Sequence, residues 1–232
     1  MYVLCLLFLS ALAVFGADAK EAKATAERLD SAANVMKEIM ATPDKGIPED
    51  LLSKANCVVV VPSLKKGAFI VGAQYGKGFV TCRKESGRAG WSAPAAIRIE
   101  GGSVGFQIGG QESEVVLLVM NEKGAERLMS TKFTLGAEGS VAAGPVGRNT
   151  QAATDAGMKA EILSYSRSRG VFAGISLTGA TLRPDEDVNQ ALYGKKLTTK
   201  EIVETNMKPP AAATKFLAEV TRHSSREKAA DR

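Results

Sequence analysis

Apolar and polar residues follow a helical period at the two ends of this chain and a strand-like period between them. In Lys20–Met40 the apolar side chains recur at spacings of three and four, which puts them on one face of a helix. Charged residues of both signs occupy the other face. This mixture favours a helix whose apolar stripe packs on the folded domain; a helix that lies on a membrane is the alternative.

Helical spacing returns near the C-terminus. Asp185–Tyr193 predicts one helix, and Thr198–Asn206 predicts another. Thr198 and Glu201 have the spacing of a capping box, so the second helix is expected to begin beside Thr198. Pro209 starts a final helix with its own apolar stripe.

The segment between these helical ends, Cys57–Arg183, has the composition of β-strands. Asn56–Val61 is a β-branched run and predicts a buried strand that ends at Pro62. Val115–Val119 is apolar throughout, as in a strand covered on both faces. Gly170–Leu177 is the last strong strand prediction.

Two further pairs of strands are predicted between these runs. Gly67–Ala73 and Gly78–Arg83 are expected to form a hairpin around Tyr75–Lys77. Gly102–Gln111 and Glu114–Met120 form the next expected pair. The sheet is therefore predicted to be largely antiparallel.

Glycine is concentrated in this strand-rich part of the chain. Of the 23 glycines, 20 lie between Gly67 and Gly179. Glycine weakens a strand unless a bulge, a tight bend or a close backbone approach requires it. We therefore predict an α+β fold with a curved, largely antiparallel, glycine-rich and barrel-like sheet, flanked by N-terminal and C-terminal helices.

The first nineteen residues have the features of a secretory signal peptide. Val3–Phe15 is an apolar run broken only by Ser10, and Ala17-Asp18-Ala19 is a small-x-small cleavage site. The run is shorter than the roughly 20 residues of a transmembrane anchor. We therefore predict an exported protein, periplasmic or extracellular. The remaining divisions are a helix with its linker, a folded domain and a flexible tail, at residues 20–46, 47–223 and 224–232.

Export changes the interpretation of the cysteines. An oxidising compartment permits a disulfide between Cys57 and Cys82, and two buried thiols are the alternative. A metal site is not expected, since the only histidine, His223, is distant in sequence.

The chain lacks the usual motifs of catalysis and cofactor binding. One histidine near the C-terminus cannot supply a Ser-His-Asp triad, and the sequence contains no phosphate-binding loop or dinucleotide fingerprint. No cofactor is therefore expected. A hydrolase with paired carboxylates stays open as an alternative, with four acidic residues to choose from: Glu112, Glu114, Asp155 and Glu161.

Basic residues near predicted turns are the strongest chemical signal. The formal charge of the chain is +5, which permits an anionic partner. If the turns share one rim, their side chains form a cationic surface suited to phosphate groups; scattered solubilising charge is the alternative. Few aromatic residues accompany the strands, so no nucleic-acid stacking surface is expected. The candidate lipid contacts are Lys65, Lys66, Lys77, Arg148, Arg167 and Arg169.

Six ordered motifs resemble the SYLF domain family, over residues from about Ile47 to Phe216. The motifs are Trp91-Ser-Ala-Pro94, Gly105-Phe-Gln-Ile-Gly109, Thr134-Leu-Gly136, Ala142-Ala-Gly-Pro-Val-Gly-Arg148, Tyr165-Ser-Arg-Ser-Arg-Gly170-Val-Phe-Ala-Gly174 and Asn189…Tyr193-Gly194. The resemblance implies a compact α/β domain that binds lipid, with phosphoinositides or other acidic phospholipids as typical ligands. It also implies that some relatives bind actin. With its export signal, the chain resembles the stand-alone bacterial envelope form.

Three functions follow, in order of preference. The first is a non-enzymatic envelope protein that binds a phospholipid or membrane surface through basic loops. The second is a structural or protein-interaction module, and the third is a hydrolase of lipid or cell-wall material.

Overall fold

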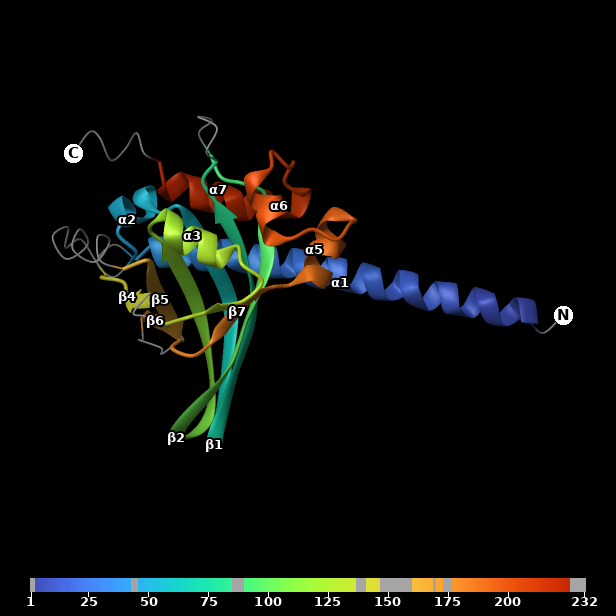
Figure 1. Cartoon of the computed structure of the whole chain (residues 1–232), viewed down its shortest axis with the longest axis horizontal. Coiled ribbons are helices and arrows are strands. Elements are labelled where there is room, and N and C mark those ends of the chain that lie inside the picture. Colours follow the sequence, from blue (N-terminus) through green and yellow to red (C-terminus); the bar gives the residue numbers. More distant parts are fainter. Residues whose placement is uncertain are drawn as a thin grey trace.

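A computed structural model describes residues 3–42, 46–84, 90–136, 141–146, 160–168, 170–172 and 177–225, with the backbone alone at 3–19, 68–71 and 103–109. It shows a curled, mostly antiparallel sheet with helices packed against it (Figure 1), which confirms the predicted α+β class. The strands are β1 (Cys57–Cys82), β2 (Ala95–Val119), β3 (Phe133–Thr134), β4 (Val141–Ala143), β5 (Ile162–Ser168), β6 (Val171–Phe172) and β7 (Thr181–Pro184). Their order in the sheet is β3-β7-β2-β5-β4, with β1 beside β2 and β6 beside β5.

The two longest strands, β1 and β2, form an antiparallel ribbon. Its pairing runs from Cys57 opposite Val119 to Val80 opposite Ala95. The ribbon doubles back on itself, because Gly78 lies against Val60 and Val61 of the same strand. A methyl group on Gly78 would come within 2.2 Å of the carbonyl oxygen of Val60, so this approach requires glycine.

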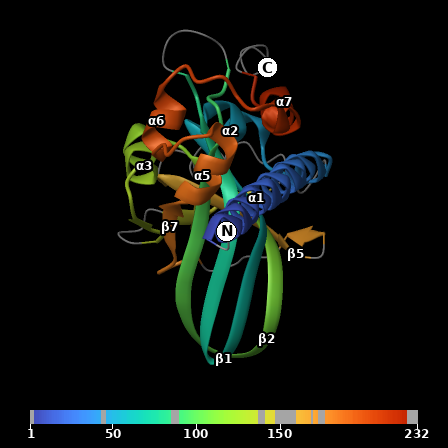
Figure 2. The ribbon, with the colours of Figure 1, turned by 90° about the vertical axis from the view of Figure 1, so that its right-hand side faces the viewer.

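The bend of the ribbon is made by a shift of register. Ala68 pairs with Gly109 and Ile70 pairs with Gly105, so β2 has more residues here than β1. The two halves of β1 touch, which makes β1 the inner strand of the bend, and the outer strand must be longer. The bent end extends away from the helices (Figures 1 and 2).

Three predictions about these strands are wrong. The hairpin expected around Tyr75–Lys77 does not form, because β1 is continuous from Cys57 to Cys82. Gly102–Gln111 and Glu114–Met120 likewise belong to the single strand β2. Pro62 does not end its strand either. It lies at a register irregularity between Val61 and Leu64, where its missing N–H is tolerated.

The sheet has a hydrophobic core on each face. On one face, Val58, Val60 and Leu118 pack with the helices at the two ends of the chain. On the other face, Val59 and Leu117 pack with two shorter helices. Alternate residues of these strands thus contribute to opposite cores, which is why the runs Val58–Val61 and Val115–Val119 are apolar throughout.

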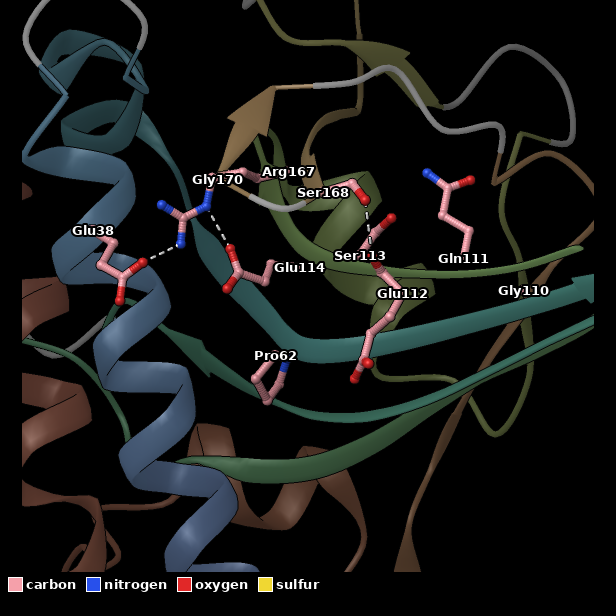
Figure 3. Close-up of a pocket in the computed structure, with 10 residues that line it drawn as sticks. All are labelled: Glu38, Pro62, Gly110, Gln111, Glu112, Ser113, Glu114, Arg167, Ser168 and Gly170. Carbon is pink, nitrogen blue, oxygen red and sulfur yellow. Dashed lines mark hydrogen bonds and ion pairs between the residues drawn. The ribbon is translucent and has the colours of Figure 1, made fainter.

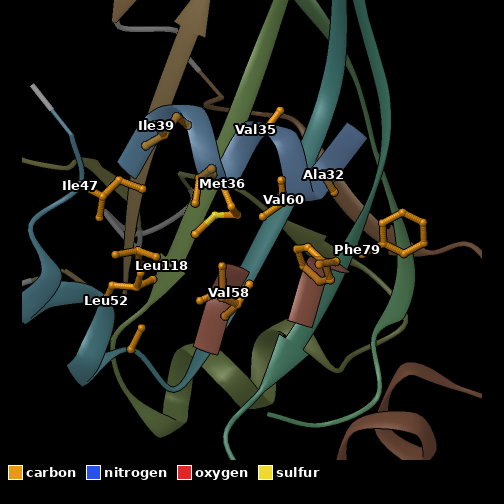
Figure 4. Close-up of a cluster of buried hydrophobic side chains, with 14 of the residues drawn as sticks. Ala32, Val35, Met36, Ile39, Ile47, Leu52, Val58, Val60, Phe79 and Leu118 are labelled. Atoms are coloured by element: carbon orange, nitrogen blue, oxygen red, sulfur yellow. The ribbon is translucent and has the colours of Figure 1, made fainter. Parts of the chain in front are cut away.

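Helix α1 (Val3–Met40) crosses the first of these cores. Its residues Ala32, Val35, Met36 and Ile39 are buried against the sheet (Figure 4), as the helical spacing predicts. The N-terminal part of α1 extends beyond the sheet (Figure 1). Within the described ranges, none of the helices combines the length and apolar character needed to cross a membrane.

The remaining helices cover the rest of the sheet. Helices α2 (Glu49–Lys54), η2 (Ala211–Ala213) and α7 (Thr214–His223) join α1 on the first core. Helices α3 (Glu122–Leu128) and α6 (Thr199–Glu204) cover the second, and α5 (Glu186–Tyr193) contributes to both. The predicted capping box is confirmed: Thr198 Oγ1 accepts from the Glu201 N–H, and the Thr198 N–H donates to the Glu201 carboxylate.

Candidate functional site

The bend of the β1–β2 ribbon contains a groove of about 560 Å³. One half of β1 lines it with Lys65, Lys66 and Gly67, and the other half with Ala73, Gln74 and Tyr75. Gly110, Gln111 and Glu112 of β2 complete the lining. We call this the ribbon groove. It exists because the ribbon doubles back, which brings residues ten positions apart to facing walls.

The charged residues of the ribbon groove are two lysines, Lys65 and Lys66, and one carboxylate, that of Glu112. The side chain of Lys65 is exposed and that of Lys66 is partly exposed. Among the residues that the structure describes, neither forms a salt bridge. The Glu112 carboxylate, which lies opposite Lys65 in the register, accepts a hydrogen bond from the Ser63 hydroxyl. Both ammonium groups are therefore available to an anionic ligand.

The other wall carries a buried amide and an exposed aromatic ring. Gln74 is only 3% exposed, and its Oε1 has no hydrogen-bond partner among the described residues. Tyr75 is 47% exposed, so part of its ring is accessible from solvent. Neither residue is predicted as a site residue from the sequence, because a lone Gln-Tyr pair in a glycine-rich strand has no recognisable spacing.

A second groove, of about 720 Å³, lies beside the first and shares Gly110, Gln111 and Glu112 with it (Figure 3). It brings Arg167 together with three carboxylates, those of Glu38, Glu112 and Glu114. The charge of this groove is therefore net negative, so it does not suit a phosphate group.

Arg167, a predicted lipid contact, is engaged inside the protein. Its side chain is 7% exposed, its Nε donates to Glu114 at 2.5 Å and its Nη2 donates to Glu38 at 2.5 Å (Figure 3). The hydrogen bond to Glu114, followed by that to Glu38, raises the pKa of Arg167 above its ordinary value. The guanidinium thus links α1 to β2 and β5.

Of the other predicted contacts, Lys77 lies at a different site from Lys65 and Lys66. Lys77 Nζ lies 2.9 Å from the buried carboxylate of Asp185 and 3.9 Å from that of Glu21, which compensates its charge. Arg148 and Arg169 lie outside the described residues. Of the four candidates among the described residues, only Lys65 and Lys66 line one groove together without a described salt bridge, and Glu112 lines the same groove.

The two predicted disulfide partners are joined. Cys57 and Cys82 form a disulfide with a Cα–Cα distance of 3.9 Å, at the end of the ribbon opposite the bend. The bridge connects the first and last residues of β1, so it closes the doubled strand covalently.

Of the four carboxylates proposed for a hydrolase, Glu112 and Glu114 line the second groove together, and two of the four are held in ion pairs. Glu161 is held by Lys123 at 3.1 Å and by Arg127 at 3.3 Å, and Glu114 is held by Arg167. Asp155 lies outside the described residues. The described residues also contain no cluster of His, Cys, Asp and Glu side chains that could hold a metal ion.

Comparison with known proteins places these features in a family. Residues 100–223 match the family model described as "Ysc84: Las17-binding protein actin regulator". The match covers β2 from Glu100 onward and every later element of the fold.

Full-length relatives extend the similarity to about three quarters of the chain. An SH3 domain-containing protein of Schizosaccharomyces pombe is 37% identical over 171 residues, which is 72% of this chain and 39% of that protein. SH3 domain-containing YSC84-like protein 1 of Homo sapiens is 35% identical over 172 residues, 74% of this chain and 49% of that protein. LAS seventeen-binding protein 3 of Saccharomyces cerevisiae is 35% identical over 173 residues, 73% and 37% respectively. The chain thus spans half or less of the length of these relatives.

Proposed function

Because this chain belongs to the Ysc84 (SYLF) family, we propose that it is a non-enzymatic binding module that attaches to an acidic phospholipid surface through the bent end of the β1–β2 ribbon. The observation that carries the proposal is the position of Lys65 and Lys66. They lie just before the register shift at Ala68–Ile70 that makes the bend, and neither forms a salt bridge among the described residues.

The composition of the ribbon end supports attachment to a membrane. Residues 67–76 of β1 and 101–111 of β2 contain no charged residue, and they include Phe69, Ile70 and Phe106. The register places these two stretches opposite each other at the bend. An uncharged, partly apolar segment beside lysines is the arrangement expected of a surface that meets lipid headgroups and the upper acyl region.

The disulfide supports the proposed export. A bond between Cys57 and Cys82 persists in the periplasm or outside the cell, whereas the cytosol keeps thiols reduced. Sequencing the N-terminus of the protein purified from its host tests this part. Cleavage after Ala19 is expected, and an intact N-terminus at Met1 in a soluble cytosolic fraction would contradict it.

A second function, protein binding, is favoured by the relatives. One of them is named a LAS seventeen-binding protein and others are SH3 domain-containing proteins. The net-negative groove around Arg167 is a surface on which a basic partner would bind. If protein binding is the function, Lys65 and Lys66 do not contact the partner.

Vesicle sedimentation tests the proposed function. The wild-type protein is expected to sediment with vesicles of phosphatidylcholine and phosphatidylglycerol, and to be released as salt rises from 0.05 to 0.5 M. Lys65→Ala/Lys66→Ala is expected to weaken binding on the order of 10- to 30-fold, since each lysine near the surface contributes about 1 kcal/mol.

The matched control is Lys195→Ala/Lys196→Ala. These two adjacent lysines are exposed on the loop after α5, and their removal changes the net charge equally. This variant should lose less than about twofold in affinity if the ribbon is the contact. Equal losses in the two variants would show that net charge alone drives binding, and the ribbon site would then be rejected.

A further inference from the structure

A pocket of about 370 Å³ reaches the Cys57–Cys82 disulfide from one side. Of these two cysteines, Cys82 lines the pocket and Cys57 does not. Met129 and Val203 form part of its wall, and they belong to the same hydrophobic cluster as both cysteines. The Cys82 side chain therefore lies on the face of the sheet where the pocket opens. We call this space the disulfide pocket.

The two sulfurs differ in accessibility. Cys82 is 6% exposed, whereas Cys57 is 1% exposed and lies in the apolar cluster that includes Val59 and Leu117. In thiol–disulfide exchange a thiolate attacks one sulfur of the bond, and access helps to determine which sulfur it attacks. A thiol in the disulfide pocket would therefore attack Sγ of Cys82, and Cys57 would be the leaving group.

This exchange balances without a further reactant. A bond forms between the sulfur of the incoming thiol and Sγ of Cys82, and the bond between Cys82 and Cys57 breaks. The electron pair of the broken bond leaves with Cys57, which takes up the proton that the incoming thiol lost. Because a neutral thiol behaves as a small hydrophobic group, the freed Cys57 leaves no charge in the apolar cluster.

One basic residue of the lining directs its charge to the other face of the sheet. The Arg83 guanidinium donates to the carbonyl oxygens of Ser53 and Ser224, and its central carbon lies 4.2 Å from the centre of the Trp91 ring. Trp91 belongs to the hydrophobic core on the face opposite the two cysteines. The charge of Arg83 therefore contributes little to ligand selection in the disulfide pocket.

The other charged residues of the lining are one cation and one anion, Lys84 and Glu204. Lys84 forms no salt bridge with a described residue, and Glu204 has one distant pairing, with Lys200 at 3.9 Å. An ammonium and a carboxylate at one pocket are complementary to the carboxylate and the ammonium of an amino acid. The thiol that carries both groups is cysteine, free or at the end of a small peptide.

We propose that the disulfide pocket binds a small amino-acid thiol, such as free cysteine, which exchanges with the disulfide and leaves a mixed disulfide on Cys82. Lys84 binds the carboxylate of the ligand and Glu204 binds its ammonium group. The site lies at the end of the β1–β2 ribbon opposite the ribbon groove, so it does not depend on the proposed membrane function. Exchange also opens the covalent link between the first and last residues of β1.

Mass spectrometry of the folded, oxidised protein tests this site. The protein is incubated with free cysteine, the exchange is stopped with acid, and the freed thiols are alkylated before digestion. A cysteine adduct on Cys82 and an alkylated Cys57 are the expected result, and peptide mapping separates both residues from Cys5. An adduct on Cys57 in place of Cys82, or a disulfide that stays intact in the folded protein, would overturn the proposal.

The urea dependence of the rate distinguishes exchange in the pocket from exchange after unfolding. Exchange through the pocket should change by less than about twofold at urea concentrations below the unfolding transition. Exchange that requires global unfolding rises with urea as steeply as the unfolding equilibrium does. A rate that follows the unfolding equilibrium would reject the pocket as the route.

Obstruction of the pocket should slow the exchange. Asn206 is an exposed residue of the lining, and Asn206→Trp is expected to reduce the rate by about tenfold or more, because access limits it. Gln190→Trp is the matched control, since Gln190 is an exposed amide on α5 outside the lining, and its rate should stay within about twofold of wild type. Urea unfolding of both variants verifies the fold. Equal rates in the two variants would contradict the proposed route.

A second thiol tests the preference for an amino acid. Cysteamine has the ammonium group of cysteine and lacks its carboxylate. Each rate is divided by that of the same thiol with the unfolded protein, which removes the intrinsic reactivity of the thiol. Wild-type protein should favour cysteine by about two- to fivefold, as for an exposed ion pair. Lys84→Gln should lose this preference, and Lys195→Gln, at an exposed lysine outside the lining, should keep it. Equal normalised rates of the two thiols with wild type would overturn the amino-acid assignment.

Discussion

Gly144 lies flat against the ring of Tyr165. A methyl group added to Gly144 would come within 2.1 Å of Cζ and 2.5 Å of the hydroxyl oxygen of that ring. The Gly144 N–H donates to the carbonyl oxygen of Ser164, which fixes the approach. This contact joins two sequence motifs, Ala142–Arg148 and Tyr165–Gly174, and assigns a packing role to a part of each.

Gly144→Ala is therefore expected to destabilise the protein by about 2 kcal/mol or more, since either the strand or the buried ring must move. Gly110→Ala is the control, because a methyl group at Gly110 would meet no atom within 4 Å. Urea unfolding of both variants measures the difference. Equal stabilities of the two variants would mean that the Tyr165 ring moves aside without loss of folding free energy.

Removal of the Tyr165 hydroxyl, unlike the Gly144 substitution, is expected to cost no stability. This hydroxyl has no hydrogen-bond partner among the described residues, whereas the Tyr193 hydroxyl donates to the carbonyl oxygen of Pro94 at 2.6 Å. Tyr165→Phe should leave the free energy of unfolding unchanged or slightly higher, and Tyr193→Phe should lower it by about 1 kcal/mol. A large loss in Tyr165→Phe would reveal a partner for that hydroxyl.

Because both tyrosines are buried, the free energy of unfolding is expected to fall at alkaline pH. Burial raises the pKa of Tyr165 and Tyr193 above their ordinary value. In the unfolded chain a tyrosine ionises near pH 10, so the unfolded state gains stability above about pH 10 while the folded side chains stay neutral. Stability present below that pH is thus lost as pH rises. Tyr165→Phe should flatten this loss in urea titrations between pH 9 and 11, and an unchanged slope would refute the assignment.

The Arg167 ion pairs are expected to matter for stability and not for lipid binding. Arg167→Met should cost about 2 kcal/mol, because two short charge-assisted hydrogen bonds are lost. Arg183→Met, which removes a more exposed pair with Glu100 at 3.0 Å, should cost less than about 1 kcal/mol. Vesicle affinity should stay within about twofold of wild type in both, given attraction near 1 kcal/mol per surface charge. A loss of vesicle binding specific to Arg167→Met would restore Arg167 as a lipid contact.

The disulfide should stabilise the ribbon measurably. Cys57 and Cys82 are 25 residues apart, and a loop of this size gives about 3 kcal/mol in the chain-entropy account. Dithiothreitol should therefore lower the melting temperature of the wild type. It should leave that of Cys57→Ala/Cys82→Ala unchanged, and a wild type indifferent to reductant would contradict the bond.

The sequence predicted the helices better than the strands. The apolar stripe of Lys20–Met40 and the Thr198–Glu201 capping box both arise from residues a few positions apart. Both can therefore be recognised from the local sequence. The course of β1 depends on contacts between Gly78 and Val60, far apart in sequence, and on a register shift that glycine spacing alone does not reveal. In the sequence, the glycine-separated segments of one long strand therefore resemble the separate arms of hairpins.

The candidate site shows the same division. Lys65 and Lys66 are recognisable as a basic pair beside glycine, and the structure places them at a groove. Arg167 has the same appearance in sequence, yet its partner Glu38 comes from α1, more than a hundred residues earlier. Gln74 is buried with no described partner for its Oε1, and only the packed structure can show this.

The doubled ribbon also dictates an order of assembly. Pairing of β1 with β2 is closest in sequence at Val80 and Ala95 and most distant at Cys57 and Val119. Because loop closure costs more entropy as the loop grows, pairing should begin near Val80 and propagate toward Cys57. Until it finishes, the apolar first half of β1 is an unpaired strand, which is the state from which chains associate wrongly. The newly made protein is thus most vulnerable to aggregation before the two ends of β1 meet.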